Sequence, residues 1–227
     1  MQLTLKSRFA GNVYIIHCVG RIVLGPESKA LEVALDTGME HGFNQFILCL
    51  SDTERIDSIG MGLLVRYAER LRRRGGDIRL AEPPPFITKL LELTQLSNAV
   101  HTYPTEEDAL LSYLRQPPPA DTVVRHGPRV LFVDESADLC VFVRTILGQH
   151  GYDVRTSCLV RDARMLLQVE GADYILAGPG TFQLPGQAVL SSLAPLAPKA
   201  VAMRLTEDFK GHDAQYATNA LLQMFQA

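Results

Sequence analysis

Three consecutive prolines interrupt the chain near its middle. They lie in the segment Gln116–Pro128, QPPPADTVVRHGP, where proline favours extended backbone and cannot continue a helix. We therefore expect no helix or sheet strand to continue through this segment. The segment 116–128 predicts a semi-rigid linker between a first domain, residues 1–115, and a second domain, residues 129–227.

The composition is that of an ordinary globular protein. Hydrophobic residues make up 47% of the 227 residues and charged residues 21%, with a net charge of −3. This balance gives no general affinity for nucleic acid or for an anionic membrane surface. The N-terminus, MQLTLKSRF, lacks the pattern of a signal peptide, and no apolar run reaches the ~20 residues of a membrane helix. We therefore expect a cytoplasmic protein.

The cysteines and histidines suggest no metal or redox chemistry. Cys18, Cys49, Cys140 and Cys158 form no CxxC pair, and we expect them to be buried free thiols in a reducing compartment. The six histidines show no metal-ligand spacing, so we expect structural or surface roles for them. The sequence thus predicts neither a cofactor nor a metal site.

In the first domain, short apolar runs alternate with amphipathic segments. This alternation predicts an α/β domain. The expected strands are Val13–Val19, Phe46–Leu50 and Asp77–Ala81, and the expected helices are Ser28–Gly42, Met61–Arg74, Phe86–Leu93 and Glu106–Leu114.

The second domain repeats the alternation and predicts a parallel sheet wrapped by helices. The expected strands are Arg129–Val133, Asp153–Ser157, Tyr174–Ala177 and Ala200–Leu205, and the expected helices are Asp138–His150, Val160–Val169 and Ala214–Phe225.

A short motif follows the strand Phe46–Leu50. The pattern D-S-x-G-x-G-x-L begins at Asp57, and a helix, Gly75-Gly76 and another strand come after it. This order resembles the STAS domain of bacterial anti-sigma-factor antagonists, over about residues 3–115. The resemblance implies a mixed sheet with helices, and a non-enzymatic protein that binds an anti-sigma factor or a regulatory protein of the serine-kinase type. The implied partner-binding loop comprises Asp57, Ser58, Ile59, Gly60, Met61 and Gly62.

The motif departs from the family at one position. The phosphorylated hydroxyl of the family usually occupies the x of D-S-x-G, which here is Ile59. Asp57 or Ser58 can cap the helix that starts near Gly60. Ser58 matches the capping serine of the family, so we expect a structural cap at Ser58, with its phosphorylation as the alternative. Ile59 would then present a permanent apolar side chain where relatives carry the switch.

The second domain resembles the receiver domain of response regulators. The resemblance rests on RVLFVDES (129–136), HGYDVRTS (150–157) and ADYIL (172–176). It implies a flavodoxin-like parallel sheet, here lacking its fifth strand because too few residues follow the fourth. The strand Ala200–Leu205 would then be a sheet edge, which we expect Ala214–Phe225 or another subunit to cover. A homo-oligomer is therefore expected.

The receiver chemistry is incomplete. Asp134 and Glu135 match the acidic pair that holds Mg²⁺ in receivers, and Thr206 matches the sensing hydroxyl. The phosphate-acceptor position, however, is Gly178, which has no carboxylate. We expect no aspartyl phosphorylation, and we expect Asp134 and Glu135 to cap the following helix.

A cluster of arginines ends the helix after the motif. It allows a solvated helix end that complements the helix dipole, or a docking patch for an acidic partner. Nucleic acid is the least favoured ligand, because no aromatic residues interleave with the cluster. The cluster comprises Arg66, Arg70, Arg72, Arg73 and Arg74.

Together these patterns predict a partner-switching regulator that is not an enzyme. Its degenerate receiver would serve as a dimerisation or docking module. Two alternatives stay open: a scaffold subunit of a larger STAS-containing assembly, and a sensor that binds a small ligand or nucleotide at the carboxyl ends of the strands.

Overall fold

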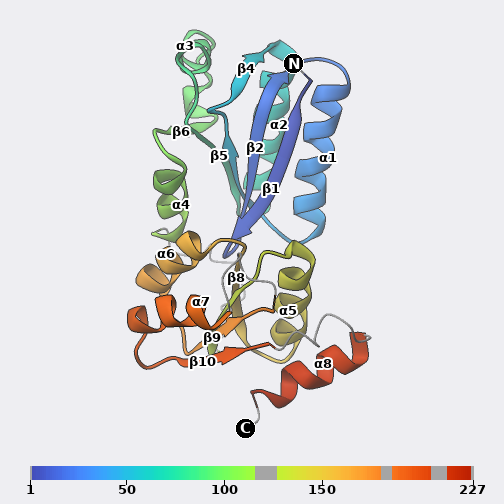
Figure 1. Cartoon of the computed structure of the whole chain (residues 1–227). Helices are drawn as coiled ribbons and strands as arrows, with labels where there is room; N and C mark the ends of the chain where they lie inside the picture. Colours follow the sequence, from blue (N-terminus) through green and yellow to red (C-terminus); the bar gives the residue numbers. More distant parts are fainter. Residues whose placement is uncertain (1, 116–126, 180–185, 206–213, 226–227) are drawn as a thin grey trace. The chain divides into compact units, whose positions relative to one another are not determined.

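The computed structural model describes residues 2–115, 127–179, 186–205 and 214–225. The chain forms two compact units (Figure 1). The first comprises Met1–Arg8 and Asn12–Thr122, and the second comprises Phe9–Gly11 and Val123–Ala227. Within the described ranges, every helix is too short or too polar to cross a membrane.

The first unit is built on a mixed sheet with the strand order β1-β2-β3-β5-β6, and β4 also pairs with β2. Strands β2, β3, β5 and β6 are parallel. Only two residues connect β1 to β2, and a connection this short can join only antiparallel strands. The strands are β1 (Thr4–Ala10), β2 (Val13–Ile22), β3 (Gln45–Cys49), β4 (Thr53–Ile56), β5 (Asp77–Ala81) and β6 (His101–Tyr103).

Helices cover this sheet and bury its apolar strands. Helix α1 packs on β2, α2 on β5, and α4 on β3 and β5. Phe46, Ile47 and Leu48 of β3 are fully buried, as their uninterrupted apolar run predicts for a strand covered on both faces. The helices are α1 (Pro26–Glu40), α2 (Ser58–Arg72), α3 (Pro85–Leu93), the 3₁₀ turn η1 (Leu96–Asn98) and α4 (Glu106–Leu114).

The second unit is a four-stranded parallel sheet with the order β8-β7-β9-β10. When the strands of this unit are numbered 1 to 4 in chain order, they lie in the order 2-1-3-4, as the first four strands of a flavodoxin-like sheet do. No fifth strand follows β10 within the described residues. The elements are β7 (Arg129–Val133), α5 (Ala137–Gln149), β8 (Asp153–Ser157), α6 (Val160–Glu170), β9 (Tyr174–Ala177), α7 (Gly186–Leu193), η2 (Ala194–Leu196), β10 (Val201–Arg204) and α8 (Ala214–Gln223).

The last helix does not take the place predicted for it. Helix α8 packs against α5, and Phe225 just after it stacks with Tyr152 and Tyr174. Strand β10 stays largely exposed at the end of the order, with Val201 53% exposed. The expectation that Ala214–Phe225 covers this strand is therefore wrong for the described residues, because α8 packs on α5 and Phe225 contacts Tyr152 and Tyr174.

Candidate functional site

Asp57 is the N-cap of α2. Its carboxylate accepts a hydrogen bond from the Gly60 N–H on Oδ1 at 2.8 Å and one from the Leu24 N–H on Oδ2 at 2.8 Å. Hydrogen bonds favour the ionised carboxylate, and the bond from Gly60 is the main cause that lowers the pKa of Asp57. One side chain thus fixes the start of α2 and ties it to the residues that follow β2.

The prediction that Ser58 caps this helix is wrong. Asp57 already fills the N-cap position, and Ser58 is the first residue of α2. The Ser58 side chain is exposed and makes no hydrogen bond to another described residue. Its hydroxyl is therefore available on the first turn of the helix.

The two glycines of the motif have different roles. A Cβ on Gly60 would lie 2.4 Å from the Ile22 carbonyl oxygen, so only glycine lets the first turn of α2 approach the end of β2 this closely. A Cβ on Gly62 would meet nothing within 4 Å. Gly60 is required by the fold itself, whereas Gly62 leaves a gap on the surface.

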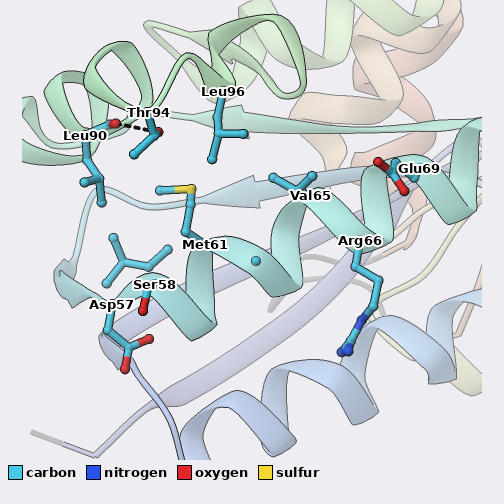
Figure 2. Close-up of a pocket in the computed structure, with 11 residues that line it drawn as sticks. Asp57, Ser58, Met61, Val65, Arg66, Glu69, Leu90, Thr94 and Leu96 are labelled. Atoms are coloured by element: carbon cyan, nitrogen blue, oxygen red, sulfur yellow. Dashed lines mark hydrogen bonds between the residues drawn. The ribbon is translucent and has the colours of Figure 1, made fainter.

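An apolar pocket of about 530 Å³ opens beside this turn, between α2 and the α3–η1 segment. Figure 2 shows Met61 and Val65 of α2 pointing toward Leu90 and Leu96. Asp57, Ser58 and Gly62 line its end at the start of α2. We call this site the α2–α3 groove; its apolar lining comprises Ile56, Met61, Val65, Leu90 and Leu96.

Ile59 lies on the same first turn of α2 but does not line the groove. Its side chain is 48% exposed, so it presents an apolar surface to solvent beside the groove. The motif therefore places an exposed apolar side chain, a free hydroxyl and an apolar groove around one helix N-terminus.

The basic cluster of α2 is mostly tied to neighbouring elements. Its arginines pair with acids on α1 and β5, which orients them along the protein surface more than it stabilises the fold. These pairs disfavour the acidic-partner interpretation of the cluster. The pairs are Arg66–Glu32 (2.8 Å), Arg70–Asp36 (2.6 Å) and Arg72–Asp77 (3.0 Å).

In the second unit, neither Asp134 nor Glu135 caps α5. The N-cap is Ser136, whose side chain accepts from the Leu139 N–H at 3.3 Å. Asp134 is fully buried and accepts from the Ser136 N–H at 2.7 Å, while Glu135 is exposed. The acidic pair of the sequence is therefore split between the core and the surface.

Gly178 lies directly against Asp134. A Cβ at this position would come within 2.0 Å of Asp134 Oδ2, so the position predicted to have lost the acceptor also has no room for one. Thr206, the predicted sensing hydroxyl, falls outside the described residues.

Sequence patterns missed a polar cluster in the first unit. His17 of β2, Cys49 at the end of β3 and Glu106 at the start of α4 bring one ligand atom each to within 4.8 Å of one another. Their spacing along the chain gives no signal; only the pairing of His17 with Cys49 across parallel strands could have suggested it. The basic group Arg8 also pairs with Glu106.

The electrostatics of this cluster centre on Glu106. Burial alone would raise the pKa of Glu106, but hydrogen bonds from His17 and Cys49 and the charge of Arg8 outweigh it and lower this pKa to about 2. Burial and the hydrogen bond to Glu106 raise the pKa of the Cys49 thiol. The four cysteines are all free and buried, as predicted, and burial raises the pKa of Cys18 to about 12.

Comparison with known proteins bears on the first unit. Residues 5–109 match the STAS domain family. A Thermotoga maritima protein named "Putative anti-sigma factor antagonist" is 33% identical over 75 residues, which are 33% of this chain and 66% of that protein. A Thermotoga neapolitana homologue gives the same identity and coverage.

One solved structure is an anti-sigma factor antagonist from Mycobacterium paratuberculosis. It is 23% identical, with 49% of this chain and 93% of that chain covered and a TM-score of 0.44. The assignment rests on the family match, together with the position of the D-S-x-G-x-G-x-L motif at the start of α2. Residues 5–109 of this chain therefore form a STAS domain, of the type found in anti-sigma factor antagonists.

Proposed function

We propose that this chain is a partner-switching regulator whose STAS domain binds an anti-sigma factor of the serine-kinase type. By holding that partner it would free a sigma factor and change transcription without contacting DNA. No catalytic step of its own is part of this proposal. The observation that carries it is the α2–α3 groove beside the exposed Ile59 on the STAS motif.

The chemistry of this surface suits an apolar protein contact. The groove lining is mainly apolar, and Ile59 adds an exposed anchor at its end of α2. Protein interfaces gain most of their affinity from a few well-packed, buried anchor residues. Because Arg66 and Arg70 are already paired with acids of α1, the partner would meet this surface through apolar side chains more than through carboxylates.

Ser58 offers a means of release. A phosphate on its exposed hydroxyl would lie at the N-terminus of α2, where backbone N–H groups favour an anion. It would also add roughly −1.5 to −2 charges at the mouth of the apolar groove. We include Ser58 as the modification site because Asp57, and not Ser58, serves as the cap.

Isothermal titration calorimetry with the purified serine-kinase-type anti-sigma factors of the source organism tests this proposal. Ile59→Asp should weaken the binding of the cognate factor at least tenfold. Val33→Asp is the matched control, since Val33 on α1 is 53% exposed and lies outside the groove, and it should bind as the wild type does. Equal affinities of wild type and Ile59→Asp would contradict the proposed surface.

For the second unit we propose a dimerisation or docking role without phosphoryl transfer. The exposed strand β10 is the surface that a second copy would cover. Sedimentation equilibrium should show a wild-type dimer that Ala202→Pro converts to monomer, because the Ala202 N–H faces the free edge while that of Val201 donates to Asp173 inside the sheet. A monomeric wild type would contradict the dimerisation role.

A small-ligand sensor is the second candidate, favoured by the size of the groove. Its volume of about 530 Å³ lies within the usual range for ligand pockets. Saturable thermal stabilisation by a nucleotide or metabolite, abolished by Met61→Lys, would support this alternative.

A further inference from the structure

The cluster around Glu106 lies at one point of the first unit where three elements meet. His17 on β2 and Cys49 on β3 are register partners in neighbouring parallel strands, and Glu106 is the first residue of α4. His17 Nε2 lies 2.9 Å from Glu106 Oε2, and Cys49 Sγ lies 3.0 Å from the same oxygen. An imidazole nitrogen, a thiol sulfur and a carboxylate oxygen thus converge.

These donors form a mixed set that suits one class of cation. Nitrogen and sulfur ligands with a carboxylate select borderline divalent metals of the zinc type over magnesium or calcium, which prefer oxygen. In a tetrahedral zinc site, neighbouring ligand atoms lie about 3.4 Å apart, given metal–ligand distances of about 2.0–2.3 Å. The 2.9 and 3.0 Å separations would need only a small expansion to admit the ion.

Binding of a divalent cation would replace the proton of the Cys49 thiol. A divalent cation binds cysteine as the thiolate and histidine as the neutral imidazole, so the Cys49 thiol gives up its proton when the ion binds. Arg8 pairs with the other carboxylate oxygen of Glu106 and holds this side chain in place.

The burial of the three side chains leaves one side open. Cys49 is 2% exposed and Glu106 is 7% exposed, whereas the His17 side chain is 39% exposed. A metal would reach the cluster past His17, and its remaining coordination position would face solvent on that side. Three protein ligands with an open fourth position are a common arrangement for zinc.

We propose that His17, Cys49 and Glu106 bind one Zn²⁺ ion at the junction of β2, β3 and α4. The site is separate from the α2–α3 groove, whose lining includes none of these residues. A bound ion would connect the N-terminus of α4 to the sheet by coordination, in place of the hydrogen bonds to Glu106.

Calorimetric titration of the metal-free full chain with Zn²⁺, carried out in two buffers that differ in ionisation enthalpy, tests the site. We expect one ion per chain and the release of one to two protons for each ion bound. Co²⁺ should give a thiolate-to-metal absorption band. His17→Gln removes one ligand atom at a partly exposed position and should lower Zn²⁺ affinity at least about 10- to 100-fold.

Cys49→Ser should abolish the Co²⁺ band, and Cys18→Ser is its matched control because Cys18 is equally buried but outside the cluster. Zn²⁺ should also raise the melting temperature of wild type and of Cys18→Ser, but not of His17→Gln. A hydrogen-bonded network without metal affinity would give no stoichiometric uptake. That result, or Zn²⁺ binding unchanged in both His17→Gln and Cys49→Ser, would overturn the proposal.

Discussion

At the residue scale, Asp57 joins two parts of the first unit that are far apart in sequence. Its two carboxylate oxygens each accept a backbone N–H, one from Gly60 inside α2 and one from Leu24 in the loop before α1. Ser58 beside it makes no comparable bond to a described residue. Of these two neighbouring polar residues, Asp57 therefore holds the start of α2 in place and Ser58 does not.

Asp57→Ala should lower the free energy of unfolding by about 1 kcal/mol, because it leaves the N–H groups of Gly60 and Leu24 without their partner. Ser58→Ala is the matched control and should change it by less than about 0.5 kcal/mol. Urea denaturation of the three proteins measures both values. A larger loss for Ser58→Ala than for Asp57→Ala would show that the cap is assigned to the wrong residue.

Glu106 gives the first unit a specific pH dependence. Its pKa is about 2 in the folded chain and about 4.5 as an unperturbed carboxyl. A lowered folded pKa means that its contribution to stability is complete above about pH 4.5 and is lost as the pH falls toward 2. The ionised carboxylate and its bonds to His17, Cys49 and Arg8 therefore stabilise the neutral-pH fold.

Glu106→Gln should flatten the fall in stability between about pH 4.5 and pH 2, and should destabilise the chain most at neutral pH. Denaturant unfolding at several pH values measures this. Glu92→Gln, at an exposed position on α3, should keep the wild-type slope. If both variants gave that slope, Glu106 would not be the titrating group.

At the element scale, the start of α2 is fixed by how closely it approaches β2. Gly60→Ala should destabilise the chain by about 1–3 kcal/mol, because its Cβ would overlap the Ile22 carbonyl oxygen. Gly62→Ala should instead stabilise it by up to about 1 kcal/mol, since alanine favours helix and nothing obstructs it. Thermal unfolding compares the pair, and equal effects would contradict the packing described for Gly60.

The same reasoning applies to the turn after β9 in the second unit. Gly178→Asp would place a carboxylate at the position that the receiver resemblance assigns to the phosphate acceptor, yet its Cβ would collide with the buried Asp134. We expect this variant to be destabilised and to remain unlabelled by acetyl phosphate, as the wild type should be. Stable phosphorylation of Gly178→Asp, seen by intact-protein mass spectrometry, would show that the turn opens more readily than its packing implies.

The elements differ in how well sequence patterns predict them. The strands Asp77–Ala81 and Arg129–Val133 have the predicted bounds. In the second of them, residues 130–133 form an apolar run that is buried along its whole length, an environment that such side chains require. Strands β1, β4 and β6 were not predicted, since they are short or half-exposed and their sequences, such as TERI and HTY, carry little apolar signal. Helix α7 was not predicted either.

Side-chain roles were harder to predict than elements. The motif predicted the turn at the start of α2, but the choice between Asp57 and Ser58 as cap depends on a loop approaching from Leu24. The cluster of His17, Cys49 and Glu106 depends on strand register and on where α4 begins. Contacts between residues far apart in sequence set both, so local patterns cannot reveal them.

At the scale of the whole molecule, the chain combines a STAS domain with a second α/β unit. In our proposal, the STAS domain makes the contact with the partner protein. The second unit, which has no room for a carboxylate at Gly178, takes part in assembly and transfers no phosphoryl group. The two roles are separable, since the α2–α3 groove is lined only by residues of the first unit.

Hydrogen–deuterium exchange of the full chain, with and without its serine-kinase-type anti-sigma factor, tests the central claim most directly. Partner binding should slow exchange in the first turns of α2 and in residues 85–98, which form the two sides of the α2–α3 groove. Exchange in α4 and in the second unit should be unchanged. Protection confined to the second unit, or absent from α2, would contradict the account.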